Sequence, residues 1–253
     1  FRYKGPFIHN SNIKDNIVFK KGTPRKLKNL DGSALSLLTG GGGNKNYWHW
    51  LFDVLPRLNL CEQTIGLNEI DYFLLPDDVQ KFQTETLDCL NIPKHKRLSS
   101  RKFRHIKAKE LIITDHPVVI TGNDTQDTHN IPAWIIQWIR GVFLNKNIVI
   151  NKENKNKIYI DRGEANNKSQ SQRSISNEDE VKKYLLKKNF ILVKLHEIKF
   201  KEQIDLFYNA ECIVGLHGAG LANLVFCKSG TRVIELRSSN AGPMYENVAK
   251  KNN

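Results

Sequence analysis

An alternation of short apolar strands and helices fills the second half of the chain and constrains the fold more than any other feature. The candidate strands cover residues 157–161, 191–195, 212–216 and 232–236, and helical patterns at 176–188, 201–208 and 221–226 separate them. Two strands joined by a helix pair in parallel, with a right-handed crossover. The pattern therefore predicts a Rossmann-like α/β domain with a mostly parallel sheet.

The first half of the chain has a less regular α/β pattern. Strands are predicted at Asp71–Leu75 and Glu110–Thr114, with hairpin-like strands at Asn16–Phe19 and Ser33–Leu38. Helices are predicted at Tyr47–Leu60, Asp77–Leu90 and Ala133–Leu144. A polar Asn/Lys-rich stretch at 145–157 has the composition of a linker. We therefore expect two domains, 1–145 and 146–253, the second truncated at its C-terminus because the sequence stops soon after Tyr245.

Composition excludes several classes of protein. The 253 residues hold 39 Lys and Arg against 26 Asp and Glu, a formal charge of +13. No run approaches the ~18 apolar residues of a membrane span, which argues against an integral membrane protein. The four cysteines (Cys61, Cys89, Cys212 and Cys227) form no CxxC pair, which argues against structural zinc. We expect buried, reduced thiols, although pairing into two bridges is the alternative.

The strongest local signal for a ligand site is Val214-Gly-Leu-His-Gly-Ala-Gly-Leu-Ala-Asn223. A buried strand ends there in a glycine-rich turn and leads into a helix, whose N-terminal amides attract phosphate. Gly218 and Gly220 would let these amides approach a diphosphate, and His217 could donate to it. The dinucleotide fingerprint GxGxxG is not met, because Asn223 replaces its last glycine. A tight turn without ligand is the alternative interpretation.

Three further residues of the second half are candidates for the same site. Glu235 ends an apolar strand and is placed to bind ribose hydroxyls, or is simply a solvated carboxylate. Arg162 follows the first strand of this domain, and Arg173 precedes a predicted helix. Both arginines could neutralise a diphosphate, since the guanidinium group forks onto phosphate oxygens.

In the first half, one helical stretch combines an apolar stripe with a polar line. Trp48, Leu51, Phe52 and Leu55 have the spacing of a buried face. His49, Asp53 and Arg57 follow one another at four-residue intervals, although Pro56 makes the place of Arg57 less certain. An imidazole oriented by a carboxylate suits a general base. A pair on a helix surface with no catalytic role is the alternative.

Several catalytic motifs are absent from the sequence. There is no strict DxD, the usual carboxylate clamp for a metal–nucleotide-sugar complex, so no motif requires a divalent metal. There is also no GxSxG and no GxxxxGK[ST], which removes lipase-type and P-loop functions.

Taken together, these motifs resemble glycosyltransferase family 61. The matching segments run in the family's order over roughly residues 46–236: Asn46–Leu58, Ile158–Arg162, Arg173 with Asn177-Glu178, Glu202-Gln203, Val214–Asn223 and Gly230–Leu236. Asp161 departs from the pattern, because many members carry serine there.

The resemblance implies a GT-B architecture, with two Rossmann-like domains facing a cleft. It implies inverting transfer of a sugar from a nucleotide-sugar donor, a UDP-sugar by preference, to a glycan or lipid-linked acceptor in surface or capsular polysaccharide synthesis. No permanently bound cofactor is expected. The expected donor side comprises Arg162, Arg173, His217, Gly218, Ala219, Gly220, Leu221, Asn223 and Glu235. His49 and Asp53 would be catalytic, and Asn46, Trp48 and Arg57 acceptor-side or structural.

Other functions compete with this one. The positive charge could serve nucleic acid or an anionic surface without catalysis, but the lysines are spread and no nucleic-acid-reading motif is present. A nicotinamide-dependent dehydrogenase lacks its third glycine, and a family member that binds without catalysis is a further alternative. We expect no nucleic-acid partner, and a cytoplasmic protein with peripheral association at the inner membrane face. A trimmed eukaryotic anchor would make the location lumenal.

Overall fold

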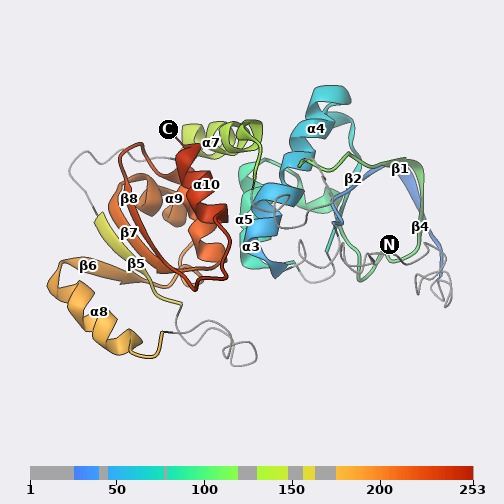
Figure 1. Cartoon of the computed structure of the whole chain (residues 1–253). Helices are drawn as coiled ribbons and strands as arrows, with labels where there is room; N and C mark the ends of the chain where they lie inside the picture. Colours follow the sequence, from blue (N-terminus) through green and yellow to red (C-terminus); the bar gives the residue numbers. More distant parts are fainter. Residues whose placement is uncertain are drawn as a thin grey trace. The chain divides into compact units, whose positions relative to one another are not determined.

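The computed structural model describes residues 26–39, 45–76, 79–118, 130–147, 156–162 and 175–252. The chain divides into two compact units, Phe1–Asp127 and Thr128–Asn253 (Figure 1). The helix predicted at the end of the first domain, together with the polar stretch after it, belongs to unit 2. The division thus falls earlier in the chain than the expected boundary at residue 145.

Unit 1 contains a four-stranded parallel sheet in the order β3-β2-β1-β4. Its elements are β1 (Lys28–Ser36), α3 (Tyr47–His49), the π-helical turn η2 (Trp50–Val54), α4 (Pro56–Thr64), η3 (Leu67–Glu69), β2 (Tyr72–Leu75), α5 (Lys81–Cys89), η4 (Lys94–Lys96), β3 (Arg97–Ser99) and β4 (Ile106–Ile112). The hairpin expected around 33–38 is wrong, because β1 pairs in parallel with both neighbours. The other hairpin-like strand, Asn16–Phe19, lies outside the described residues.

Unit 2 contains a second four-stranded parallel sheet, in the order β6-β5-β7-β8. Its elements are α7 (Ala133–Asn147), β5 (Asn156–Ile160), α8 (Glu178–Lys187), β6 (Phe190–Val193), α9 (Phe200–Tyr208), β7 (Ala210–Leu216), the 3₁₀ helix η6 (Ala219–Phe226), β8 (Arg232–Leu236) and α10 (Met244–Lys250). The parallel sheet predicted for the second half is confirmed.

Both sheets have a point at which the strand order reverses. In unit 2 the chain places β6 on one side of β5 and then β7 and β8 on the other. In unit 1 it places β2 and β3 on one side of β1 and β4 on the other. Open parallel sheets bind ligands outside the carboxyl ends of the strands at such a point. Ligand sites are therefore expected at the carboxyl ends of β5 and β7 in unit 2, and of β1 and β4 in unit 1.

The two faces of the unit 2 sheet are covered by different helices. On one face, Leu185 and Val181 of α8 pack against Tyr159, Cys212 and Val214. On the other, three buried phenylalanines interlock edge to face: Phe143 of α7, Phe200 of α9 and Phe226 of η6, with ring centroids 5.0–6.3 Å apart. This aromatic cluster joins α7 to unit 2.

The cluster predicts which unit a core deletion affects. Phe143→Ala should lower the free energy of unfolding of unit 2 by about 3–5 kcal/mol, the usual cost of deleting a buried phenylalanine. Hydrogen exchange read by mass spectrometry should show faster exchange in β5–β8 and unchanged protection in β1–β4. Phe73→Ala, at a buried position of β2, is the mirrored control and should affect unit 1. Faster exchange in unit 1 with Phe143→Ala would contradict the placement of α7.

All four cysteines are free thiols, as expected; Cys61, Cys212 and Cys227 are buried, whereas Cys89 is half-buried and departs from the expectation. Burial raises the pKa of the Cys227 thiol to about 12. Among the described residues, no group of three or more His, Cys, Asp or Glu is arranged to hold a metal ion. In the same part of the chain, no helix has the length and the apolar character that crossing a bilayer requires.

Candidate functional site

The glycine-rich turn of unit 2 follows β7 directly and therefore lies at the switch point of its sheet. The backbone amide of His217 donates to the carbonyl oxygen of Leu236 (2.8 Å), which continues the β7–β8 ladder by one residue. The first hydrogen bond of η6 joins the amide of Leu221 to the carbonyl oxygen of Gly218 (2.9 Å). The amides of Ala219 and Gly220 thus have no acceptor within their own helix, as at any helix N-terminus.

The imidazole of His217 is paired with the carboxylate of Glu235. Nδ1 of His217 lies 2.5 Å from Oε1 of Glu235, and the two side chains are 10% and 12% exposed. The β7–β8 register places Glu235 beside Gly215. Because Gly215 lies two residues before His217, this register brings the carboxylate close to the imidazole. The ring of Tyr245, from α10, contacts the imidazole edge to face with centroids 4.9 Å apart.

Arg162 lies at the end of β5, across the switch point from this turn. A Cβ atom placed on Gly218 would lie 3.8 Å from Cζ of Arg162, so the guanidinium group runs beside the turn. Arg162 is exposed, whereas the preceding Asp161 is buried and pairs with Lys182 (2.9 Å). The structure thus brings Arg162 close to Gly218, the residue after His217, and the role of the three residues in one ligand site stays a prediction. Arg173 lies outside the described residues.

Packing accounts for two other residues of the predicted donor set. A Cβ atom on Gly220 would lie 2.9 Å from Cδ1 of Leu195, so glycine is needed there for close contact with the loop after β6. Asn223 is fully buried, and its Nδ2 donates to Oε1 of Gln203 (2.9 Å). Gln203 in turn donates to the carbonyl oxygen of Leu195 (2.8 Å). Gly220 therefore packs the turn against the loop after β6, and Asn223 ties it to Gln203 of α9. Leu221 is also buried, so its side chain belongs to the core.

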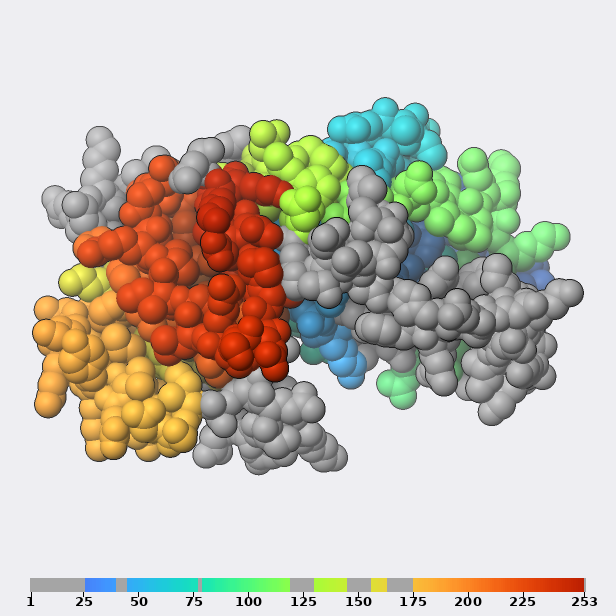
Figure 2. All heavy atoms as spheres, in the orientation of Figure 1, coloured from blue at the N-terminus to red at the C-terminus, as the bar shows by residue number. Residues whose placement is uncertain are grey.

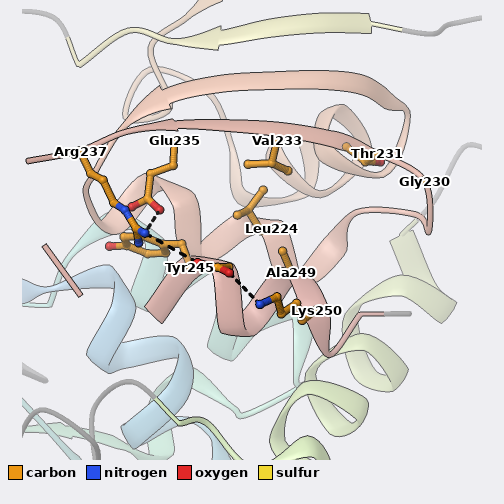
Figure 3. A pocket seen from close by; sticks show the side chains of 10 residues that line it. Leu224, Gly230, Thr231, Val233, Glu235, Arg237, Tyr245, Ala249 and Lys250 are labelled. Carbon is orange, nitrogen blue, oxygen red and sulfur yellow. Dashed lines mark hydrogen bonds and ion pairs between the residues drawn. The ribbon is translucent and has the colours of Figure 1, made fainter. Parts of the chain in front are cut away.

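A cavity of about 560 Å³ lies beside this site, between β8 and α10 (Figure 3). Glu235 and Tyr245 belong both to the cavity wall and to the surroundings of His217. Leu224, Val233 and Ala249 supply apolar lining. In the space-filling view, the C-terminal part of unit 2, drawn in red, occupies much of the displayed face of that unit (Figure 2).

In unit 1, the structure pairs His49 with Asp53 as expected. Nδ1 of His49 lies 2.5 Å from Oδ2 of Asp53, and the side chains are 30% and 17% exposed. The predicted continuous helix is interrupted by the π-helical turn η2, in which the amide of Leu55 donates to the carbonyl oxygen of Trp50 (3.0 Å). Pro56 begins α4. Because proline lacks an N–H and its ring would collide with the carbonyl four residues earlier, a widened turn accommodates it.

The remaining predicted residues of this stretch support the His49–Asp53 pair. Asn46 caps α3, its side chain accepting from the amide of Trp48 (2.9 Å), and Trp48 is buried against Phe52. Arg57 is buried, and its Nε donates to the carbonyl oxygen of Asp53 (3.0 Å). Burial lowers the pKa of Arg57, while the negative charges of Asp53 and Asp115 act in the opposite direction.

Sequence reasoning missed three residues next to these two pairs. Arg237 is 3.6 Å from Oε2 of Glu235 and 3.7 Å from Glu246, so it links β8 to α10. Tyr245 contacts His217, and Thr114 accepts from Arg57 through its carbonyl oxygen (3.4 Å). For Arg237 a weak signal existed, since it directly follows the predicted strand 232–236, two residues after Glu235. For the other two, the sequence held none.

Two parallel α/β units, each with a switch point and a histidine paired to a carboxylate, place the protein in the Rossmann-like class of α/β proteins. A family model, Glycosyltransferase 61, matches residues 47–234, and the chain belongs to this family. The matched range includes His49, Asp53 and His217, and Glu235 is the residue directly after it. A search of curated proteins found no match. Family membership implies a glycosyltransferase with a sugar donor and an acceptor, and it does not favour the nucleic-acid-binding alternative.

Proposed function

We propose that the protein transfers a sugar, with inversion at the anomeric carbon, from a nucleotide-sugar to a hydroxyl group of a glycan or lipid-linked acceptor. A UDP-sugar is the preferred donor, and surface polysaccharide synthesis the preferred context. The observation that carries the proposal is the turn at His217 and Gly218, which lies at the switch point of the unit 2 sheet with Arg162 beside it. This combination of free amides and cations suits a diphosphate.

In the proposed mechanism, unit 2 binds the leaving group. His217, Arg162, Arg173 and the amides of the turn hold the diphosphate of the donor. As the bond between the anomeric carbon and the diphosphate oxygen breaks, negative charge builds on that oxygen. Groups already aimed at such a charge provide one of the largest contributions to catalysis. No step of this scheme relies on a metal ion.

Unit 1 supplies the base in the same proposal. Asp53 holds His49 through Nδ1, which leaves Nε2 to take the proton of the acceptor hydroxyl. The hydroxyl oxygen forms its new bond to the anomeric carbon on the face opposite the diphosphate, and this inverts the configuration. The scheme requires both units to close on one cleft, the GT-B arrangement, which is part of the proposal.

We also propose a cytoplasmic location at the inner membrane face. Four free thiols suit a reducing compartment, and the charge of +13 suits attraction to anionic lipid or to a lipid-linked acceptor.

The first test is a binding screen. Isothermal calorimetry and thermal unfolding should detect UDP or GDP rather than CMP, which carries one phosphate, and EDTA should not abolish the effect. A nucleotide at about 100 times its Kd stabilises the folded state by about 2.7 kcal/mol, which raises the melting temperature measurably. NAD⁺ and a DNA duplex are the negative controls. Binding of either control in place of a nucleoside diphosphate would overturn the proposal.

A second readout tests the stereochemistry. With the donor identified, proton NMR of the first product formed should show the anomeric configuration opposite to that of the donor sugar. Retention of configuration would contradict the role of His49 as a base acting on the acceptor.

A further inference from the structure

Glu235 does not stand at the strand end as a free carboxylate. Its Oε1 is committed to Nδ1 of His217 at 2.5 Å, and its Oε2 lies 3.6 Å from Nη1 of Arg237. We propose that Glu235 is a positioning residue: it orients His217 so that the ring, which takes up a second proton when the donor binds, directs Nε2–H at the diphosphate. This inference rests on the proposed function, and it replaces the ribose contact expected from the sequence.

The hydrogen-bond geometry carries the argument. With Nδ1 occupied by Glu235, only Nε2 of His217 is left for a ligand, and none of the interactions of the described residues engages it. A neutral ring that donates through Nδ1 has a lone pair at Nε2, which repels a phosphate oxygen. The ring can therefore donate to a diphosphate through Nε2 only if it takes up a second proton. The carboxylate compensates the charge so created, in a place where water screens it little.

The surroundings of the ring hold this arrangement in place. Tyr245 of α10 fixes the ring from its side, and the backbone of His217 is bonded to β8. Arg237 contacts both Glu235 and Glu246, so the carboxylate is held from the helix as well (Figure 3). Among the described residues, the charged groups near the imidazole are Glu235 in β8, Arg237 directly after that strand, and Arg162 beside the neighbouring Gly218. Of these, only Glu235 bonds to the ring.

The test uses inorganic pyrophosphate beside UDP, because the two probes separate a positioning role from a ribose contact. Glu235→Gln should weaken binding of both about tenfold, the scale of one lost charge-assisted interaction. A ribose ligand would instead affect UDP and leave pyrophosphate unchanged, which would overturn the proposal. Glu235→Asp, which keeps the charge, should bind pyrophosphate more tightly than Glu235→Gln. If the aspartate variant bound no better than the glutamine variant, the charge would not be what matters.

A double-mutant cycle and proton counting complete the test. In a His217→Asn background, Glu235→Gln should no longer weaken pyrophosphate binding, because the charge that Glu235 compensates is gone. Calorimetry in two buffers of different ionisation enthalpy should show greater proton uptake for the wild type than for His217→Asn. Equal uptake, or an undiminished effect of Glu235→Gln in the double variant, would refute the proposal.

The matched control is Glu211→Gln. Glu211 also pairs with a cation across β7 and β8, through Arg232 (2.5 Å), but at the amino ends of these strands. Its substitution should leave pyrophosphate binding unchanged. If the wild type bound neither UDP nor pyrophosphate, the donor site itself would fail. If it bound both and Glu235→Gln bound as tightly, only the role of Glu235 would fail.

Discussion

His49→Asn should reduce kcat by about 10²–10⁴-fold, the range that general-base catalysis contributes. Asparagine keeps a polar side chain of similar reach but has no nitrogen that can accept a proton. The pair with Asp53, at 2.5 Å, orients the ring through Nδ1, so the loss concerns proton transfer at Nε2. The Kd for the donor nucleotide should stay as in the wild type, because in the proposed mechanism unit 2 binds the diphosphate. Steady-state kinetics combined with calorimetry checks both expectations.

His95→Asn is the matched control for this variant. His95 is exposed in η4, which precedes β3 and so lies toward the amino end of that strand. The ligand-binding edge of a parallel sheet is the other one. This variant should keep both kcat and the nucleotide Kd. If His49→Asn kept kcat within a few-fold of the wild type, the base would have to be another group.

The parallel sheet of unit 2 was accessible from the sequence because its strands alternate with helices, and its two central strands, β5 and β7, are largely buried apolar runs. The buried strand at 212–216 and its partner at 232–236 were predicted close to their observed bounds. The π-helical turn was not, because the stripe of Trp48, Leu51, Phe52 and Leu55 fits both an α-helix and a widened turn. Only Pro56 marked the interruption.

The division between the two compact units precedes α7, whereas composition led us to expect a boundary at residue 145, because local composition describes a loop and not what packs across it. The polar stretch after residue 145 does separate two elements of structure, α7 and β5. The elements on both sides nevertheless belong to unit 2, where Phe143 meets Phe200 and Phe226. A periodic apolar face shows that a helix is buried, but it does not identify the partner.

The same limit applies to the site residues: those set by local sequence could be predicted, whereas those set by packing between distant segments could not. A strand, a glycine turn and a helix in succession place His217 and Gly218 from local sequence alone. Glu235 follows His217 by 18 residues, and only the strand register brings the two side chains together. Asn223 shows the converse limit, because a buried amide that holds two segments together has the same residue type as one that faces a ligand.

His217→Ala should weaken UDP binding and also lower kcat by about 10²–10³-fold, as loss of one donor to a developing anion does in other active sites. Two effects add in this variant. The imidazolium proposed to contact the diphosphate is removed, and Glu235, which is 12% exposed, loses its partner and would present a carboxylate to an anionic ligand. Calorimetry with UDP and steady-state kinetics measure the two losses, with His95→Ala as the control.

The double variant His217→Ala, Glu235→Gln separates these effects. Because the repelling carboxylate is absent, it should bind UDP more tightly than His217→Ala alone, although less tightly than the wild type. UDP binding of His217→Ala at the wild-type level would show that the diphosphate does not lie at this turn. The contrast with His49→Asn is the strongest part of the test, because one histidine should affect catalysis alone and the other both binding and catalysis. Only a division of labour between a base and a leaving-group site produces that pattern.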